Sequence, residues 1–356
     1  ADDYGLSLVV GGGESTLWEL TGAYASLART VLDHRGNEGS DDRSVHPPWA
    51  TAGAHKGTGS PRTAPLNAAA CYHALVAMQN VNRPDVESGW QRFDGAERIA
   101  WKTGTSYGHR DAWAIGVTDR FAVGVWTGNA SGEGRPGLTG TLAAAPLLFD
   151  AFASLPVGHG FDPPFDGMAR MAICRPSGHR AGPDCAPVDT IWTIREAERT
   201  DPCPYHRSIL VNATGDRRMA PGPDATAVSW FALPPAMEHF YSATRPSYRP
   251  MPPWADGAGR SFAEQPIQMI YPASGAALLV PVQLSGAVGH IVLQAAHRDP
   301  GSTLYWDLDG NYLGSTTGQH EQATAITDGE HLLTLTDDHG QNLNCRFRAT
   351  VATAVR

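Results

Sequence analysis

Two segments near the start of the chain carry apolar residues at helical spacing. In residues 16–32 and 66–78 the apolar positions recur every three or four residues, which places them on one face of an α-helix. Each segment therefore predicts an amphipathic helix that packs against a core. The polar segment between them, residues 33–65, contains glycine and proline and predicts a loop. We expect the second helix to end at Asn82-Arg83-Pro84, since proline disfavours helix in the residue before it.

The pattern then changes to β-branched and aromatic residues, which are typical of strands. The run extends from Ile99 to Trp126 and is interrupted by Thr118-Asp119-Arg120, a polar triplet that favours a hairpin turn. We expect about three antiparallel strands here, the first of which Lys102 opens. Residues 138–155 are apolar again and predict a helix that packs across this sheet.

The last stretch of the chain, from residue 266, consists of short apolar runs separated by turns such as 309–311 and 338–340. Regular spacing of short strands and turns predicts a small β-sandwich of immunoglobulin-like type. We expect Trp306 to be an anchor of its core, and we interpret its scattered histidines as structural rather than metal-binding. The candidate strands are 268–271, 278–284, 290–296, 304–308, 331–336 and 343–351.

The intervening residues, 158–264, are rich in proline, arginine and cysteine and include a proline-rich segment, 243–254, that predicts an extended linker. The sequence therefore predicts an α+β protein of three parts. These are residues 1–157 with the helices and the first sheet, a connector at 158–264, and the sandwich at 265–356.

Composition narrows the class of protein. With 356 residues, 42% of them apolar and 18% charged, the chain is long enough for two or three folded domains. A net charge of −9 argues against a nucleic-acid partner, because binding phosphates needs clustered positive charge. The sequence has no apolar run of membrane-spanning length, and its first residues do not resemble a signal peptide.

The residues that carry the clearest chemistry are Lys102, Thr103, Gly104 and Thr105. An ammonium group and two hydroxyls stand here on one predicted strand, beside a glycine where another backbone can approach closely. Such a strand suits a peptide that bears a carboxylate and adds itself to the sheet edge. The glycine-rich segment 132–137 matches a dinucleotide-binding pattern, but a proline- and glycine-rich stretch follows it where a parallel βαβ unit would be needed, so we set that function aside.

Lys-Thr-Gly is one of three motifs of the penicillin-recognising serine acyltransferases. The segments before it (4–25 and 66–85), after it (111–129) and in the connector (174–185, 203–206 and 230–238) resemble the bifunctional class A penicillin-binding proteins of the 1C type. The resemblance implies the C-terminal portion of a transpeptidase fold, an antiparallel sheet with helices, followed by the family's connector and β-sandwich.

This resemblance also implies roles for the strand residues. Lys102 would act in the proton handling and electrostatics around a nucleophilic serine. Thr103 and Thr105 would bind the terminal carboxylate of the substrate, with Gly104 between them, and the backbone N–H near Thr105 would complete an oxyanion hole. The implied reaction is D,D-transpeptidation of peptidoglycan stem peptides through an acyl-serine intermediate, without a cofactor.

The family's other two motifs, Ser-x-x-Lys and Ser-x-Asn, do not occur in this sequence. The chain has two lysines, Lys56 and Lys102, and neither has serine three residues earlier; no asparagine has serine two residues earlier. We therefore expect a C-terminal fragment, inactive by itself, whose nucleophile, glycosyltransferase domain and membrane anchor lie upstream.

The complete protein would work at the periplasmic face of the inner membrane. It would bind β-lactams, and its C-terminal domain could bind other cell-wall synthesis proteins. The alternative is a non-catalytic fragment that binds the cell wall or a partner.

Three of the five cysteines, Cys174, Cys185 and Cys203, lie in the connector together with His206. We expect a segment with little core of its own to be held by a disulfide or by a zinc ion. Ten residues separate Cys174 from Cys185, unlike the short Cys-x-x-Cys spacing of typical zinc sites. We therefore favour a Cys174–Cys185 disulfide and no metal, which leaves Cys203 without an obvious partner.

Overall fold

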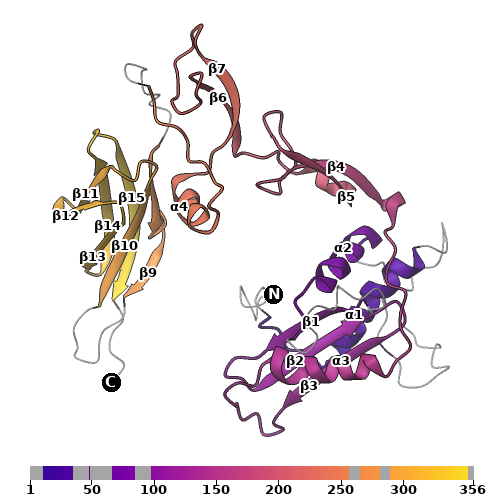
Figure 1. Cartoon of the computed structure of the whole chain (residues 1–356). Helices are drawn as coiled ribbons and strands as arrows, with labels where there is room; N and C mark the ends of the chain where they lie inside the picture. The colour runs from indigo at the N-terminus through magenta and orange to yellow at the C-terminus, as the bar shows by residue number, and fades with distance from the viewer. Residues whose placement is uncertain are drawn as a thin grey trace. The chain divides into compact units, whose positions relative to one another are not determined.

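A computed structural model of the chain forms two compact units, which are described separately (Figure 1). The first contains the residues up to Ala172 together with Thr190–Thr200, and the second contains Ile173–Asp189 and the residues from Asp201 onward. Among the described residues, no helix is both long and apolar enough to cross a membrane. The structure describes residues 11–34, 48, 66–84, 98–255, 265–280 and 289–351.

The first unit is built on a three-stranded antiparallel sheet in the order β1-β2-β3. The sequence predicted these strands and the hairpin turn at 118–120, whose ends are joined by a hydrogen bond from the Thr118 N–H to the Phe121 carbonyl. Helices cover both faces of the sheet: α1 and α2 lie on one side, and η4 and α3 on the other (Figure 1). The elements are α1 (Leu17–Asp33), α2 (Ala68–Gln79), β1 (Ala100–Thr105), β2 (Asp111–Val117), β3 (Ala122–Gly128), the π-helix η4 (Gly140–Ala144) and α3 (Ala145–Ala153).

The two predicted N-terminal helices begin where their side chains can satisfy free backbone N–H groups. Thr16 and Glu19 form a capping box at α1, in which the Thr16 hydroxyl accepts from the Glu19 N–H and the Glu19 carboxylate accepts from the Thr16 N–H. The Asn67 side chain caps α2 by accepting from the Ala70 N–H at 2.8 Å. The predicted loop at 33–65 falls almost entirely outside the described residues, as do residues 1–10 of the family resemblance.

The connector has more regular structure than its proline content predicts. It contains two hairpins, β4-β5 and β6-β7, and a helix, α4. The proline-rich segment continues after α4 and is tied to the β6-β7 region by a bridge between Arg218 and Trp254. The elements are η5 (Phe165–Gly167), β4 (Met168–Cys174), β5 (Val188–Ile194), η6 (Arg195–Arg199), β6 (His206–Val211), β7 (Thr226–Phe231) and α4 (Pro235–Thr244).

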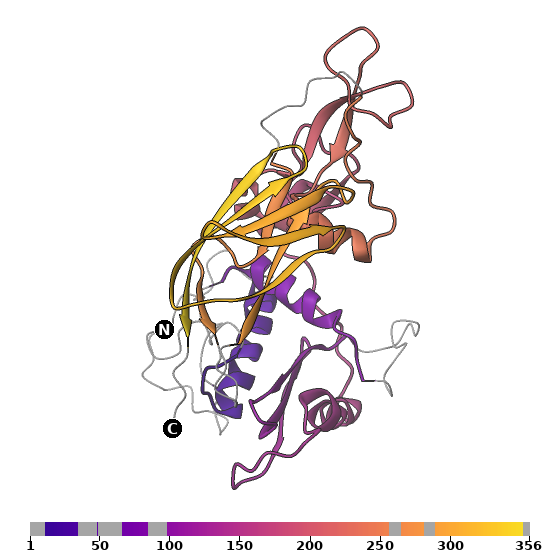
Figure 2. The same cartoon turned by 90° about the vertical axis from the view of Figure 1, so that its left-hand side faces the viewer.

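The C-terminal part is the expected all-β region, orange to yellow in Figures 1 and 2. One sheet has the order β13-β10-β8 and the other β12-β11-β14-β15-β9, with β15 and β9 parallel and the other pairs antiparallel. One core cluster, which includes the fully buried Trp306 and Phe347, lies among these strands. The strands are β8 (Ile267–Tyr271), β9 (Ala277–Val280), β10 (His290–His297), β11 (Thr303–Leu308), β12 (Asn311–Thr317), β13 (His320–Ala325), β14 (Gly329–Asp337) and β15 (Asn342–Val351).

Six of these strands correspond to the predicted ones, and β12 and β13 are additional. The predicted strand 278–284 is described as far as Val280, since its last residues lie outside the described part of the chain. Trp306 is a core residue, as expected, and its indole N–H donates to the Thr316 hydroxyl at 2.8 Å.

Candidate functional site

The predicted Lys-Thr-Gly strand is β1, at one edge of the first sheet. Within the described residues β1 has β2 as its single hydrogen-bonded neighbour and is therefore an edge strand of this sheet. The strand begins with buried Ala100 and Trp101 and becomes accessible from Lys102 onward. A buried anchor followed by an accessible end holds the backbone rigidly while presenting its polar groups to solvent.

Strand alternation divides the four predicted site residues between two faces. Ala100 packs in the cluster of α1 and α2, whereas Trp101 packs in the cluster of η4 and α3, where it contacts Phe149 edge-on at 5.0 Å between ring centroids. Lys102 and Gly104 therefore share the face of Ala100, and Thr103 and Thr105 share the face of Trp101. The structure brings the four residues together along one edge but aims their side chains in two directions.

The start of η4 packs against the face of β1 that carries Thr103 and Thr105. The Gly140 N–H donates to the Thr105 hydroxyl at 3.0 Å. A Cβ atom at position 140 would lie 2.6 Å from the Trp113 carbonyl oxygen and 2.7 Å from that of Gly104, distances that real Cβ atoms do not show. Glycine is thus needed for η4 to reach the site strand. The sequence carries no local signal for this role, since residues 105 and 140 meet by packing alone.

The ammonium group of Lys102 is exposed and donates to the carbonyl oxygen of Thr103 at 2.6 Å. This single bond leaves two of its three N–H donors for other acceptors. The Thr105 hydroxyl accepts from Gly140, and its own O–H remains able to donate. The accessible end of β1 therefore presents a cation and a hydroxyl donor to solvent.

His109 and Arg110 lie in the connection between β1 and β2. His109 has a positive φ of 55°, and its Nδ1 atom lies 3.2 Å from the carbonyl oxygen of Leu138. The Arg135 N–H also donates to the His109 carbonyl at 3.0 Å. These contacts give His109 a structural role in shaping the strand connection.

A second group of chemically active side chains lies in the connector, within the second unit. The Sγ atoms of Cys174, Cys185 and Cys203 and a ring nitrogen of His206 all lie within 4.8 Å of one another. Cys174, Cys203 and His206 are buried, and Cys185 is half-buried. All five cysteines of the chain are free thiols in the structure, including the predicted disulfide partners Cys174 and Cys185.

Neighbouring groups act differently on two of these thiols. Burial raises the pKa of the Cys185 thiol to about 11. Burial also raises the pKa of the Cys203 thiol, but hydrogen bonds with Ser177 and His206 outweigh it and lower that pKa to about 6. The cluster thus brings together two thiols, Cys185 and Cys203, whose pKa values are shifted in opposite directions.

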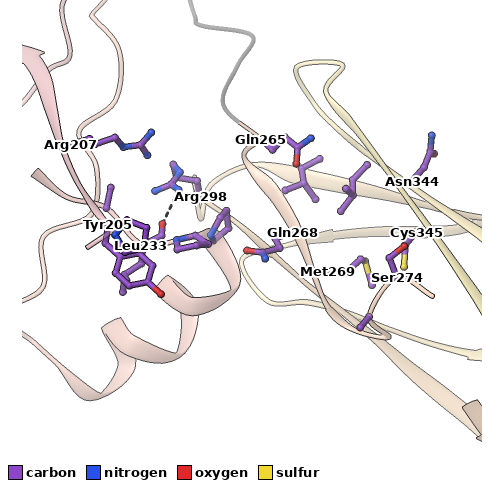
Figure 3. A pocket seen from close by; sticks show the side chains of 17 residues that line it. Tyr205, Arg207, Leu233, Gln265, Gln268, Met269, Ser274, Arg298, Asn344 and Cys345 are labelled. Carbon is purple, nitrogen blue, oxygen red and sulfur yellow. Dashed lines mark hydrogen bonds between the residues drawn. The ribbon is translucent and has the colours of Figure 1, made fainter. Parts of the chain in front are cut away.

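A pocket of about 820 Å³ lies where the connector meets the sandwich in the second unit (Figure 3). Arg207 and Arg298 both line this pocket, and Arg298 donates to the Leu233 carbonyl at 2.9 Å and to the Glu238 carboxylate at 2.8 Å. The Gln268 side chain accepts from the Ala236 N–H at 3.1 Å. The Arg298 and Gln268 side chains are engaged in holding α4 against β8 and β10, so they support a structural role for this pocket.

Comparison with known proteins relates this chain to penicillin-binding proteins. The family model described as the Penicillin-Binding Protein C-terminus Family matches residues 256–347. Penicillin-binding protein 1C of Escherichia coli strain K12 is 26% identical over 376 residues, which cover 96% of this chain and 43% of that protein. The chain therefore spans less than half the length of this relative. Fibronectin(III)-like modules of Clostridium thermocellum CbhA match at 15% identity and a TM-score of 0.20, over 24% of this chain and 99% of theirs, which is too low to support a structural argument.

Proposed function

The chain resembles the bifunctional penicillin-binding proteins of the 1C type, and its C-terminal part matches their C-terminal domain. We propose that the chain supplies the Lys-Thr-Gly strand of a peptidoglycan D,D-transpeptidase. The observation that carries the proposal is the position of this motif in β1. Lys102 and Thr105 are accessible there, on an edge strand whose outer side has no hydrogen-bonded neighbour within the described residues.

In the proposed reaction a stem peptide aligns beside β1 as an additional strand, and its backbone pairs with the open edge. The Thr103 and Thr105 hydroxyls donate to its terminal carboxylate. Thr105 is well prepared for this, because its oxygen already accepts from Gly140 and its O–H is left to donate. The Lys102 ammonium adds positive charge beside the reacting carbonyl.

The covalent steps need a serine that we propose lies outside this chain, because the sequence has no Ser-x-x-Lys motif. The serine oxygen attacks the carbonyl of the D-Ala-D-Ala bond, the terminal D-alanine leaves with a proton, and an amine of a second stem peptide then displaces the serine. The negative charge on the carbonyl oxygen would be stabilised by the backbone N–H near Thr105, a contact that strengthens as the charge develops.

The full-length protein would also contain a glycosyltransferase, bind β-lactams and act from the periplasmic face of the inner membrane. These properties belong to the proposal and follow from the resemblance to the 1C type. No cofactor is needed for acyl transfer of this kind, since serine, lysine and backbone donors supply the nucleophile, the proton transfer and the oxyanion stabilisation.

Acylation by a fluorescent penicillin tests the proposal. We expect no covalent label on the present chain and a stoichiometric label on a longer protein that includes the preceding region. In that longer protein Lys102→Ala should slow acylation by at least about 100-fold, the scale seen when one electrostatic contact is removed from such a site. Lys56→Ala, which removes the other lysine of the chain, is the matched control and should label at the normal rate.

Two results would contradict this function. A label on a serine of the present chain would place the nucleophile here and overturn the role given to β1. Equal acylation rates for Lys102→Ala and Lys56→Ala would show that the Lys-Thr-Gly strand does not take part in the reaction.

The second candidate function is non-catalytic binding to the cell wall or to proteins that build it, through the C-terminal domain. It is favoured by the family match at 256–347, which covers the sandwich rather than the strand site. Co-sedimentation of the present chain with purified peptidoglycan tests it. Binding that is unchanged in Lys102→Ala would support a separate binding module, whereas binding abolished by that substitution would assign it to β1.

A further inference from the structure

The cluster of Cys174, Cys185, Cys203 and His206 is the group of side chains that the proposed transpeptidase site does not use. Among the described residues it is the one group of at least three cysteine, histidine or acidic side chains whose ligand atoms converge in this way. Hydrogen bonding alone does not account for it, because thiols are weak donors and weak acceptors. Three buried or half-buried thiols around one imidazole indicate a ligand.

The distances fit a tetrahedral metal ion. Zinc bonds of about 2.3 Å to sulfur and about 2.0–2.1 Å to nitrogen place a sulfur and a nitrogen about 3.6 Å apart, and two sulfurs about 3.8 Å apart. The Nδ1 atom of His206 lies 3.3 Å from the Cys174 sulfur and 3.6 Å from the Cys203 sulfur. All four ligand atoms lie within 4.8 Å of one another, so small adjustments bring each to bonding distance of one ion.

Backbone hydrogen bonds hold the ligands in this arrangement. The turn after β4 is closed by bonds between Cys174 and the loop residues Gly178 and His179, each 2.8 Å long. The Cys203 N–H donates to the Arg180 carbonyl at 2.8 Å, which joins the segment before β6 to the same loop. The ligands thus come from a short, interconnected region and do not depend on long mobile side chains.

We propose that Cys174, Cys185, Cys203 and His206 bind one structural Zn²⁺ ion through three sulfurs and Nδ1. Four protein ligands complete the tetrahedron and leave no open position for substrate, which is the property of a structural rather than a catalytic zinc site. Binding displaces the thiol protons, and the ion's charge is offset by the thiolates. The ion cross-links the β4 turn to the start of β6 in a connector of short hairpins. This inference is independent of the proposed transpeptidase function.

The competing arrangement is the Cys174–Cys185 disulfide that the sequence favours. A disulfide brings two sulfurs to about 2.05 Å and leaves Cys203 and His206 beside it without a shared role. Zinc uses all four residues. The two arrangements differ in metal content and in the number of free thiols, so one set of measurements separates them.

The first measurement is the metal content of the full chain, purified without a histidine tag and analysed by inductively coupled plasma mass spectrometry. We expect about one zinc per chain, and all five thiols should react in denaturant after chelation. Replacing the ion with Co²⁺ should give the absorption bands of a tetrahedral, thiolate-bound cobalt centre. A metal-free chain with two fewer reactive thiols and a Cys174–Cys185 cross-link would overturn the proposal.

Matched substitutions then assign the ligands. Cys203→Ser and His206→Ala should each lower zinc retention at least tenfold under a competing chelator. Cys345→Ser removes a buried cysteine of the sandwich, and His179→Ala removes an exposed histidine of the neighbouring turn; both variants should keep the ion. Zinc that is retained by Cys203→Ser and His206→Ala but lost from a control variant would place the metal elsewhere and refute the site.

Discussion

The first sheet and the C-terminal sandwich bury their apolar residues in different ways. The β1-β2-β3 sheet is covered by helices on both faces and divides its apolar residues between two clusters. The sandwich encloses one cluster, with large side chains such as Trp306, Leu333 and Phe347 almost completely buried. The first sheet keeps the end of β1 accessible at an edge, whereas the sandwich buries its largest aromatic residue, Trp306, on the interior strand β11.

This difference suggests that the first sheet holds the proposed site, whereas the sandwich contributes mainly to stability. If β1 binds a peptide as proposed, it needs unpaired backbone groups and close approach at small residues such as Gly104, which contribute little hydrophobic burial. The sandwich buries large apolar side chains and can stabilise its own fold. Substitutions in the sandwich should therefore change stability, and substitutions around β1 should change the site.

The largest expected effect is in the sandwich core. Trp306→Ala removes a fully buried indole and its hydrogen bond to Thr316, and should lower the free energy of unfolding by about 3–5 kcal/mol. Tyr312→Ala, on the neighbouring strand β12, is the control, because Tyr312 is 64% exposed and its loss should change stability by less than about 0.5 kcal/mol. Urea denaturation of the full chain measures both, and similar losses for the two would contradict a single buried core.

The junction of the connector and the sandwich is held by the ion pair of Arg298 and Glu238, 2.8 Å apart, with side chains 13% and 10% exposed. Glu238→Ala leaves a largely buried guanidinium without its carboxylate and should cost about 1.5–3 kcal/mol. The control is Glu330→Ala, since Glu330 pairs with Arg348 at 3.9 Å between exposed side chains. Denaturation curves that shift equally would show that the buried pair has no special role.

Much of this architecture was predictable because its signals are local. The turn at Thr118-Asp119-Arg120, the two N-terminal helices and six sandwich strands all follow from residue type and spacing. Strands β12 and β13 were missed because their sequences, Asn311–Thr317 and His320–Ala325, are mostly polar or small. They form through pairing with β11 and β10, and such pairing leaves no period of large apolar residues in the strand itself.

The sites were predictable to a similar extent. The Lys-Thr-Gly motif identified β1 from its residues alone, but the contact between Gly140 and Thr105 joins positions 35 residues apart and has no sequence signal. In the connector the sequence indicated the four residues whose ligand atoms converge in the structure, and it favoured a disulfide. The spacing between Cys174 and Cys185 could not show that β4 and β6 bring Cys203 and His206 to the same point.

Gly140 allows a test of the first sheet that leaves its polar groups intact. Gly140→Ala places a Cβ against the carbonyl oxygens of Trp113 and Gly104, which are backbone atoms and cannot rotate away, and should cost about 1–3 kcal/mol. Because η4 must then move from β1, we also expect faster hydrogen exchange at residues 100–105. Gly167→Ala, where the nearest atom is 3.9 Å from the added Cβ, is the control. Unchanged exchange in Gly140→Ala would show that η4 does not support the site strand.

The smallest effect is a pH dependence in the sandwich. The Nδ1–H of His331 donates to the Asp309 carboxylate at 2.7 Å and its Nε2–H donates to the Thr327 carbonyl at 2.9 Å, so the protonated ring is satisfied at both nitrogens. Burial lowers the pKa of His331, but these hydrogen bonds outweigh it and raise that pKa above the ordinary 6.5. Burial raises the pKa of Asp309, and the hydrogen bond from His331 outweighs it and lowers that pKa below 3.8.

The signs of these two shifts define the window in which the pair stabilises the fold. The raised pKa of His331 contributes stability that is fully present below about pH 6.5 and is lost as the pH rises through the folded-state pKa. The lowered pKa of Asp309 contributes stability that is present above about pH 3.8 and is lost as the pH falls through its folded-state pKa. Asp309→Asn, which tolerates the positive φ of 55° at this turn, should therefore destabilise the chain more at pH 5.5 than at pH 9, by less than about 1 kcal/mol because Asp309 is 40% exposed. The control is Asp224→Asn, which removes an exposed carboxylate and should show no such pH dependence. If the loss of stability in Asp309→Asn instead grows from pH 5.5 to pH 9, the neutral histidine and not the cation is the stabilising partner.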